Sequence, residues 1–247
     1  MMHNELPIAT FAAPASMRAL CTGECGTDAR GDHPLDVQIF HIRMANSARR
    51  REAASVLIRK MYGWRGYAFD PQRVQEANKI TLYAETGGMV VGTMSLCLDS
   101  PILLPADENF HDKLDALRTQ GRRLSEPSRL AIDKGVTKRV FASLIHICYI
   151  YARTIHRFSD YVIEVNPRHV MFYQRMLGFH QTGAERPCTR VGAPAVLLRL
   201  PLEHMAEQIL AWGGRMEQHG EERSFYPYFF APQDEPGITG HLIAGLN

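Results

Sequence analysis

The chain has 247 residues, of which 45% are hydrophobic and 22% are charged, as in an ordinary globular protein with one large domain or one domain with tails. The formal net charge of +2 gives no sign of nucleic acid as a partner, and no basic nucleic-acid-binding motif is present. We find no signal-peptide pattern and no run of about 20 apolar residues that could span a bilayer. We therefore expect a soluble, cytoplasmic protein.

Cysteine and histidine spacing predicts neither a metal nor a bound cofactor. The five cysteines are an odd, scattered set, and no second Cys or His pair follows the first two to complete a zinc site. The histidines of the second half of the chain do not share one helix face at a metal-ligand spacing. Reduced thiols are expected.

Three regions follow one another along the chain. Residues 1–36 lack sustained periodicity and are predicted to be a loosely ordered leader, within which Phe11 to Leu20 could form a short helix. Residues 37–216 show regular patterns and are predicted to form the main domain. Residues 217–247 carry several aromatic side chains and are expected to pack back on that domain.

Hydrophobic periodicity predicts six strands and five helices in residues 37–216. The strands are expected at Val37–Ala45, Ile80–Glu85, Met89–Leu98, Leu124–Asp133, Tyr161–Val165 and Ala195–Leu200. The helices are expected at Ser47–Tyr62, Phe110–Gln120, Lys138–Phe158, Pro167–Gly178 and Glu203–Trp212. Mostly consecutive strands with helical crossovers indicate a mixed α/β sheet, and the lack of a GxGxxG turn argues against a dinucleotide fold.

Four segments carry a resemblance to a known family. They are Tyr62–Tyr67, Glu126–Asp133, Asn166–Phe179 and Cys188–Ala195. In this order and spacing they resemble the bacterial long-chain N-acyl amino acid synthases (the FeeM-like family). That family is related to the acyl-homoserine-lactone autoinducer synthases, whose central strand carries a similar Glu-x-Ser-Arg pattern. The resemblance covers about residues 37–202.

The resemblance implies a GNAT fold, which is the acyl-CoA N-acyltransferase fold with a mixed central sheet flanked by helices. It also implies transfer of a fatty acyl group from an acyl carrier protein to the α-amine of an amino acid. The donor is then the acyl-phosphopantetheine of the carrier protein. The departure from acetyl-CoA-dependent relatives lies in the turn before the long helix, Asp133–Arg139, which holds a single glycine where those relatives cradle a pyrophosphate.

Amide formation requires a base, because an α-amine is mostly protonated at neutral pH. Glu126 is the candidate base, with the hydroxyl of Ser128 beside it. Strand alternation predicts that Glu126, Ser128 and Leu130 share one face. The alternative interpretation is that Glu126 is a strand-edge carboxylate paired with Arg122 or Arg123.

Arg129 and Arg65 are candidates to bind the carboxylate of the amino acid, since a guanidinium can grip a carboxylate through two hydrogen bonds. Arg129 could equally be an ion-pair partner of Asp133 or Glu164, and both interpretations stay open.

Further residues are candidates to line the substrate site. Trp64 and Tyr67 could wall the pocket, or pack in the core. Backbone amides near Leu130 and Ala131 are expected to stabilise the oxyanion. Tyr173 lies where many GNAT enzymes place a tyrosine that protonates the leaving thiolate, although a core tyrosine fits the pattern as well. The apolar side of the long helix could line an acyl tunnel, which the sequence cannot separate from a core stripe.

An acidic carrier protein would need a basic docking surface. The candidates share positive charge near helix starts: Arg49, Arg50, Arg51, Lys134, Lys138 and Arg139. A solvated face is the alternative. Two other functions stay open, namely an acyl-homoserine-lactone synthase that uses S-adenosylmethionine, and a non-catalytic sensor of acyl carriers or lipids. A lipid product also suggests peripheral membrane contact, and the oligomeric state is left unassigned.

Overall fold

The computed structural model describes residues 6–14, 37–63, 78–188, 192–218, 220 and 222–245. Its centre is a mixed sheet in the order β1-β2-β3-β4-β5-β6-β9-β7, with β8 paired to β9. The strands are β1 (Ala9–Pro14), β2 (Val37–Met44), β3 (Lys79–Thr86), β4 (Met89–Leu98), β5 (Leu124–Ile132), β6 (Asp160–Val165), β7 (His180–Gln181), β8 (Arg186–Cys188) and β9 (Ala193–Pro201). The expected mixed sheet flanked by helices is confirmed.

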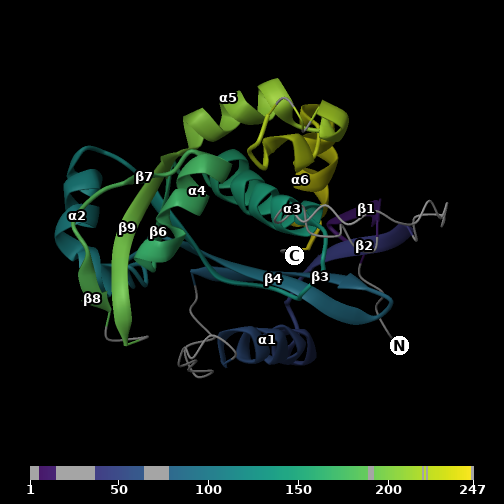
Figure 1. The fold of residues 1–247 in the computed structure, drawn as a ribbon, viewed down its shortest axis with the longest axis horizontal. Helices are drawn as coiled ribbons and strands as arrows, with labels where there is room; N and C mark the ends of the chain where they lie inside the picture. The colour runs from purple at the N-terminus through teal and green to yellow at the C-terminus, as the bar shows by residue number, and fades with distance from the viewer. Residues whose placement is uncertain are drawn as a thin grey trace, which may run out of the picture.

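The helices cover both faces of this sheet. They are α1 (Ala48–Gly63), α2 (Asp107–Thr119), α3 (Lys138–Tyr149), α4 (Val170–Leu177), α5 (Leu202–Trp212) and α6 (Glu235–Ala244). Figure 1 shows α1 on one face and α3 on the other, with α5 and α6 packed outside α3. No helix among the described residues is long and apolar enough to cross a membrane.

One expectation about local structure is wrong, and the expected long helix changes type over its last part. The segment from Phe11 to Pro14 is part of strand β1 and not a helix, because its backbone pairs antiparallel with β2, where Phe11 lies opposite Phe40 and stacks on its ring. The long helix is not α-helical throughout, since a π-helical segment, Ile150–Ile155, follows α3. The expected leader thus contributes an edge strand to the sheet.

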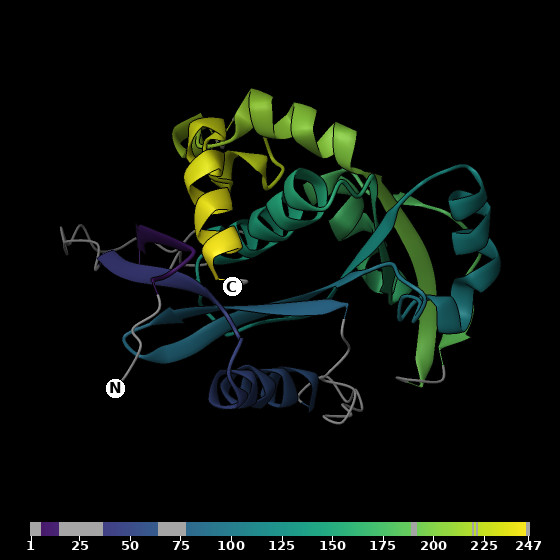
Figure 2. The ribbon, with the colours of Figure 1, turned by 180° about the vertical axis from the view of Figure 1, so that it is seen from behind.

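The C-terminal segment packs on α3, as Figure 2 shows from behind. Tyr226 and Phe229 are fully buried there. His146 of α3 accepts a hydrogen bond from the backbone N–H of Phe230 at Nδ1 (3.1 Å), and its Nε2 lies 3.1 Å from Glu235 Oε1. The aromatic tail therefore belongs to the same hydrophobic core as the sheet.

Strands β5 and β6 pair only at their start. Leu124 lies opposite Asp160 and Ser125 opposite Tyr161, and no further pairs follow. Because β5 continues to Ile132 and β6 to Val165, the two parallel strands diverge into a gap in the middle of the sheet. This gap positions the candidate site.

Candidate active site

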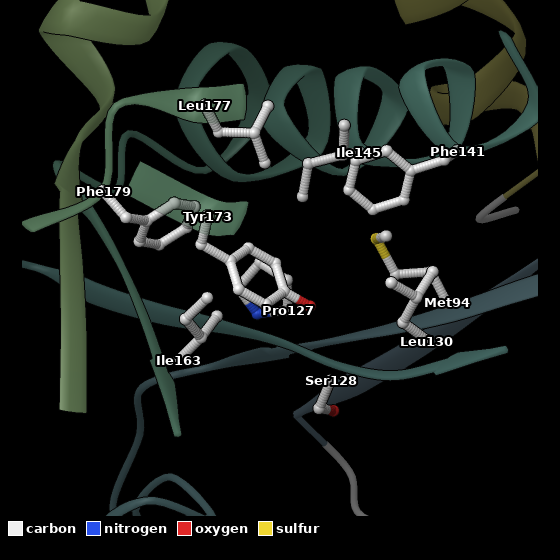
Figure 3. Close-up of a pocket in the computed structure, with 10 residues that line it drawn as sticks. All are labelled: Met94, Pro127, Ser128, Leu130, Phe141, Ile145, Ile163, Tyr173, Leu177 and Phe179. Atoms are coloured by element: carbon white, nitrogen blue, oxygen red, sulfur yellow. The ribbon is translucent and has the colours of Figure 1, made fainter. Parts of the chain in front are cut away.

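A small pocket lies at the gap between β5 and β6. Its lining is almost wholly apolar and comes from the sheet, α3 and α4: Met94, Pro127, Ser128, Leu130, Phe141, Ile145, Ile163, Tyr173, Leu177 and Phe179. Figure 3 shows the side chains of α3 and α4 above the strands, facing the gap. A lining of this composition suits an apolar ligand.

A β-bulge in β5 decides which side chains face this pocket. Arg129 and Leu130 together oppose the single residue Met94, because Ser128 pairs with Ser95 and Ala131 with Thr93. Arg129 adopts a φ of 50°, which lies in the left-handed region that non-glycine residues seldom occupy. The extra residue reverses the alternation of side chains beyond this point.

The prediction that Glu126, Ser128 and Leu130 share a face is therefore wrong for Leu130. Leu130 lines the pocket on the α3 side, whereas the Ser128 side chain points the other way in Figure 3. Ala131, next along the strand, packs against α1 on the opposite face.

The carboxylate of Glu126 lies on the side of α2. It is buried, with 4% of the residue exposed, and accepts a hydrogen bond of 2.8 Å from the backbone N–H of Ala106, just before α2. Strand β5 is an interior strand, so Glu126 is not at a sheet edge, and Arg122 donates instead to Asp160 at 2.5 Å. Glu126 is thus near the gap but on the face away from the apolar pocket.

Tyr173 is brought into the pocket wall from α4. Its ring packs edge-on against those of Phe172 and Phe179, with centroids 5.2 and 5.8 Å apart. Of the other predicted binding residues, Trp64, Arg65 and Tyr67 lie outside the described residues. The roles of Arg129 and Ala131 stay predictions, with Arg129 placed at the bulge.

The six predicted docking residues lie near the starts of two helices, α1 and α3. Lys134 and Lys138 are exposed close to the start of α3. Arg49, Arg50 and Arg51 begin α1, whereas Lys60 near its other end pairs with Asp133 at 3.0 Å. At a rise of about 1.5 Å per residue, roughly 15 Å separates these arginines from the turn at Asp133.

Arg139 is misassigned as a docking residue. Its guanidinium lies over the ring of Phe11, 5.1 Å from the centroid, and Nη1 is 2.9 Å from Met216 Sδ. Burial lowers the pKa of this guanidinium. Arg139 therefore joins α3 to β1 and the C-terminal segment and is not a surface cation.

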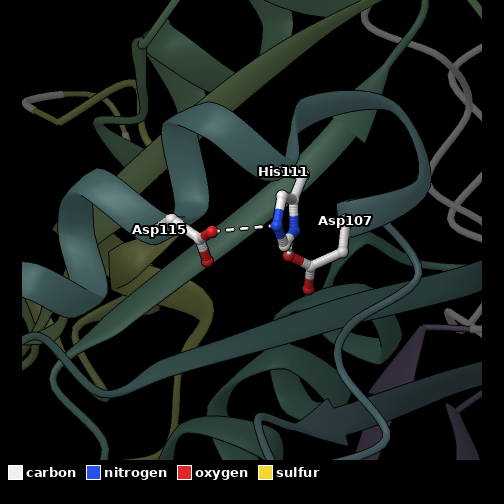
Figure 4. A group of neighbouring side chains, drawn as sticks. All are labelled: Asp107, His111 and Asp115. Carbon is white, nitrogen blue, oxygen red and sulfur yellow. Dashed lines mark hydrogen bonds and ion pairs between the residues drawn. The ribbon is translucent and has the colours of Figure 1, made fainter.

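Asp107, His111 and Asp115 form a cluster along α2 whose ligand atoms lie within 4.8 Å of one another (Figure 4). Arg118 already donates to both carboxylates, at 2.7 Å to Asp107 Oδ1 and 2.8 Å to Asp115 Oδ1. Burial acts to raise the pKa of Asp107, but the hydrogen bonds from Arg118 and from a backbone N–H outweigh it, so the pKa is lowered. We interpret the cluster as an ion-pair network, and the absence of a metal stays a prediction.

Sequence reasoning did not assign most of the pocket wall. Phe141 and Ile145 are spaced four apart on α3, which is the spacing of a helix face, but core packing gives the same signal. Ile163 on β6 and Phe179 after α4 carried no separate signal for a binding role. Their convergence depends on the gap, which is a long-range feature of the sheet.

Comparison with known proteins identifies relatives of this arrangement. The family model described as "N-acyl amino acid synthase FeeM" matches residues 53–201. The solved structure of FeeM, an N-acyl amino acid synthase from uncultured soil microbes, is 30% identical, with a TM-score of 0.62 over 67% of this chain and 92% of that one. No curated protein sequence matches the chain.

More distant structures share less with the chain. The acyl-homoserine-lactone synthase LasI is 15% identical with a TM-score of 0.48, over 66% of this chain and 90% of that one. An N-acetyltransferase from Staphylococcus aureus Mu50 is 11% identical with a TM-score of 0.49, over 66% of this chain and 98% of that one.

Proposed function

Because the chain belongs to the FeeM family of N-acyl amino acid synthases and is thus a GNAT-fold acyltransferase, we propose that it transfers a long-chain fatty acyl group from an acyl carrier protein to the α-amine of an amino acid. The observation that carries this proposal is the apolar pocket at the gap between β5 and β6. Such a pocket offers the acyl chain an apolar environment beside an open strand backbone, to which a thioester can be held.

The turn before α3 supports a carrier protein as donor. Asp133 accepts a hydrogen bond of 2.9 Å from the backbone N–H of Lys134 and also pairs with Lys60. The Asp133 carboxylate thus takes up a backbone N–H group and adds negative charge at the turn where a CoA pyrophosphate would need hydrogen-bond donors. Lys134 and Lys138 remain exposed beside this turn and suit an acidic carrier. Lys138 precedes Phe141 of the pocket by three residues, on the same side of the helix.

In the proposed reaction, the acyl chain occupies the α3 face of the gap and the amine approaches from the face that carries Glu126 and Ser128. Glu126 assists removal of a proton from the amine through water. The amine nitrogen then attacks the thioester carbonyl, and a C–N bond forms as the C–S bond breaks and the nitrogen gives up a second proton to water. This proton replaces the one that Tyr173 gives to the leaving thiolate. The backbone N–H groups of Leu130 and Ala131 stabilise the oxyanion, Arg129 binds the carboxylate of the acceptor, and Tyr173 protonates the leaving thiolate.

Two further parts of the proposal concern contact with a membrane and the cellular compartment. Met171 and Phe172 are 52% and 41% exposed beside the pocket, since Phe172 contacts both Phe141 and Tyr173. These apolar side chains suit peripheral contact with a membrane that receives a lipid product. The described cysteines are free thiols, which fits a reducing cytoplasm.

The test is to incubate the purified chain with long-chain acyl carrier protein and a pool of the common amino acids, and to identify products by mass spectrometry. An N-acyl amino acid supports the proposal and names the acceptor. An acyl-homoserine lactone that forms only after S-adenosylmethionine is added would instead identify an autoinducer synthase. Binding of the acyl carrier protein without any product would indicate a sensor.

A further inference from the structure

A second carboxylate lies across the gap from the residues of β5. The parallel register of β5 and β6 places Leu124 opposite Asp160 and Ser125 opposite Tyr161. Continued along both strands, the same register places Ser128 opposite Glu164. Because the strands have separated by this point, the space between them exceeds the spacing of about 4.8 Å between paired strands. Ser128 and Glu164 therefore belong to opposite walls of the gap.

The side chain of Glu164 points to the α2 face. Ile163, its neighbour, lines the apolar pocket on the α3 face, so alternation directs Glu164 the other way. The contact with α2 agrees, since Asn109 Nδ2 donates to Glu164 Oε1 at 3.1 Å. Glu164 is partly exposed, whereas Glu126 on the other wall is buried. The α2 face of the gap thus carries two carboxylates, of which Glu164 is the more accessible.

The position of Asn109 is itself fixed. Arg186 of β8 donates to the backbone carbonyl of Asn109 at 2.8 Å and forms two hydrogen bonds with Asp112, at 2.6 and 2.9 Å. These contacts hold α2 against β8, the short strand that pairs with β9. The amide of Asn109 accordingly presents Glu164 in a defined orientation at the gap.

We propose that Glu164 binds the ammonium group of the acceptor amino acid before acyl transfer. A carboxylate forms strong, charge-assisted hydrogen bonds with an ammonium ion, and this one lies on the face of the gap from which the amine is proposed to approach. Its role is to hold the acceptor, and Glu126 on the facing wall then assists loss of the proton. The role of Glu164 rests on the proposed function, because only an amine acceptor requires it.

The decisive variant is Glu164→Gln, because glutamine can keep the hydrogen bond from Asn109 while the charge is lost. With the amino acid that gives most product, we expect KM for that amino acid to rise about tenfold or more, and KM for the acyl donor to stay within about twofold. Glu207→Gln, at an exposed site on α5, is the matched control and should behave as the wild type.

The pH profile separates binding from a merely structural effect. Raising the pH converts the acceptor to the neutral amine, so the deficit of Glu164→Gln should shrink as the pH rises. A second variant, Asn109→Ala, keeps the charge of Glu164 but removes the hydrogen bond that orients its carboxylate. It should raise KM for the amino acid by a smaller factor. An unchanged KM for the amino acid in Glu164→Gln, or an equal deficit at every pH, would overturn the inference. If the wild-type chain makes no amide, the proposed function itself fails.

Discussion

The buried carboxylate of Glu126 accepts a hydrogen bond of 2.8 Å from the backbone N–H of Ala106, so the middle of β5 is tied to the turn that precedes α2. One residue thereby connects the strand beside the gap with the helix that holds Asn109. Any role of Glu126 in catalysis is coupled to this structural role.

Two substitutions at this position separate the roles. Glu126→Ala leaves the amide of Ala106 without this acceptor and should lower the free energy of unfolding by about 1–3 kcal/mol. Glu126→Gln keeps an acceptor oxygen and should be less destabilising, while it removes the charge that assists deprotonation. Urea unfolding measures the first effect and turnover the second. Wild-type turnover in Glu126→Gln would exclude the carboxylate as the base.

The contact between His146 and Glu235 predicts a pH-dependent stability. Burial lowers the pKa of His146, and the hydrogen bond with Glu235 and the charge of Asp234 oppose this only in part. The unfolded chain binds a proton near pH 6.5, which the native imidazole resists. The contribution of His146 to the free energy of unfolding should therefore be fully present above that pH. It should decrease as the pH drops below it, by up to about 1.4 kcal/mol at pH 5.5.

Urea midpoints at pH 7.5 and 5.5 measure this dependence for the wild type and for His146→Gln. The variant should be less stable at both pH values and should show a shallower loss between them. A residual slope is expected from His156 and His180, whose pKa values burial also lowers. An identical slope in the variant would show that His146 does not contribute.

The pocket predicts a change in acyl-chain preference. Ile145 is 3% exposed and lines the pocket, so Ile145→Phe should take up part of its volume. We expect kcat/KM to fall severalfold for the longest chains and to change little for short ones, together with an overpacking cost of about 1–3 kcal/mol. A series of acyl carrier proteins with increasing chain length provides the measurement. Leu210→Phe, at a residue 72% exposed on α5, is the control and should leave the preference unchanged.

The buried carboxylate of Asp160 predicts a large loss of stability on substitution. It accepts hydrogen bonds from Arg122 Nε (2.5 Å), Arg199 Nε (2.7 Å) and Ser159 Oγ (2.6 Å). Asp160→Asn leaves two arginines near a neutral side chain and should cost about 3–5 kcal/mol in chemical denaturation. Asp160 pairs with Leu124 in the first of the two residue pairs that join β5 and β6 at the closed end of the gap. A loss well below this range would therefore show that the closed end of the gap does not depend on Asp160.

The strands of the sheet could be predicted from the sequence where a local pattern has a single physical explanation. Alternation predicted β2 to β6 and β9, and the left-handed Gly178, with a φ of 83°, ends α4 as expected. Strand β1 was missed because its pairing with β2 joins residues far apart in sequence. Pro127 in β5 suggests either a bulge or an edge strand. The bulge lies two residues further on, at Arg129 and Leu130, where an arginine and not a glycine adopts a positive φ.

Less of the site followed from the sequence. Tyr173 and Leu130 were assigned to the site and do line the pocket, but the gap that creates the pocket arises from the divergence of β5 and β6. Glu164 was considered only as an ion-pair partner of Arg129. Strand register was needed to place it opposite Ser128, and no single-residue pattern contains that information.

The segment shared with relatives is smaller than the unit that must fold. The family match covers residues 53–201, whereas β1 and β2 lie before it and the C-terminal aromatic residues that bury α3 lie after it. A chain trimmed to the match would expose the apolar surface of α3 and leave the amides of β3 open along one edge. Truncation to the matched residues should therefore cause aggregation and should not yield a minimal catalytic unit. Segments exchanged between relatives are better joined in loops than at the ends of the matched region.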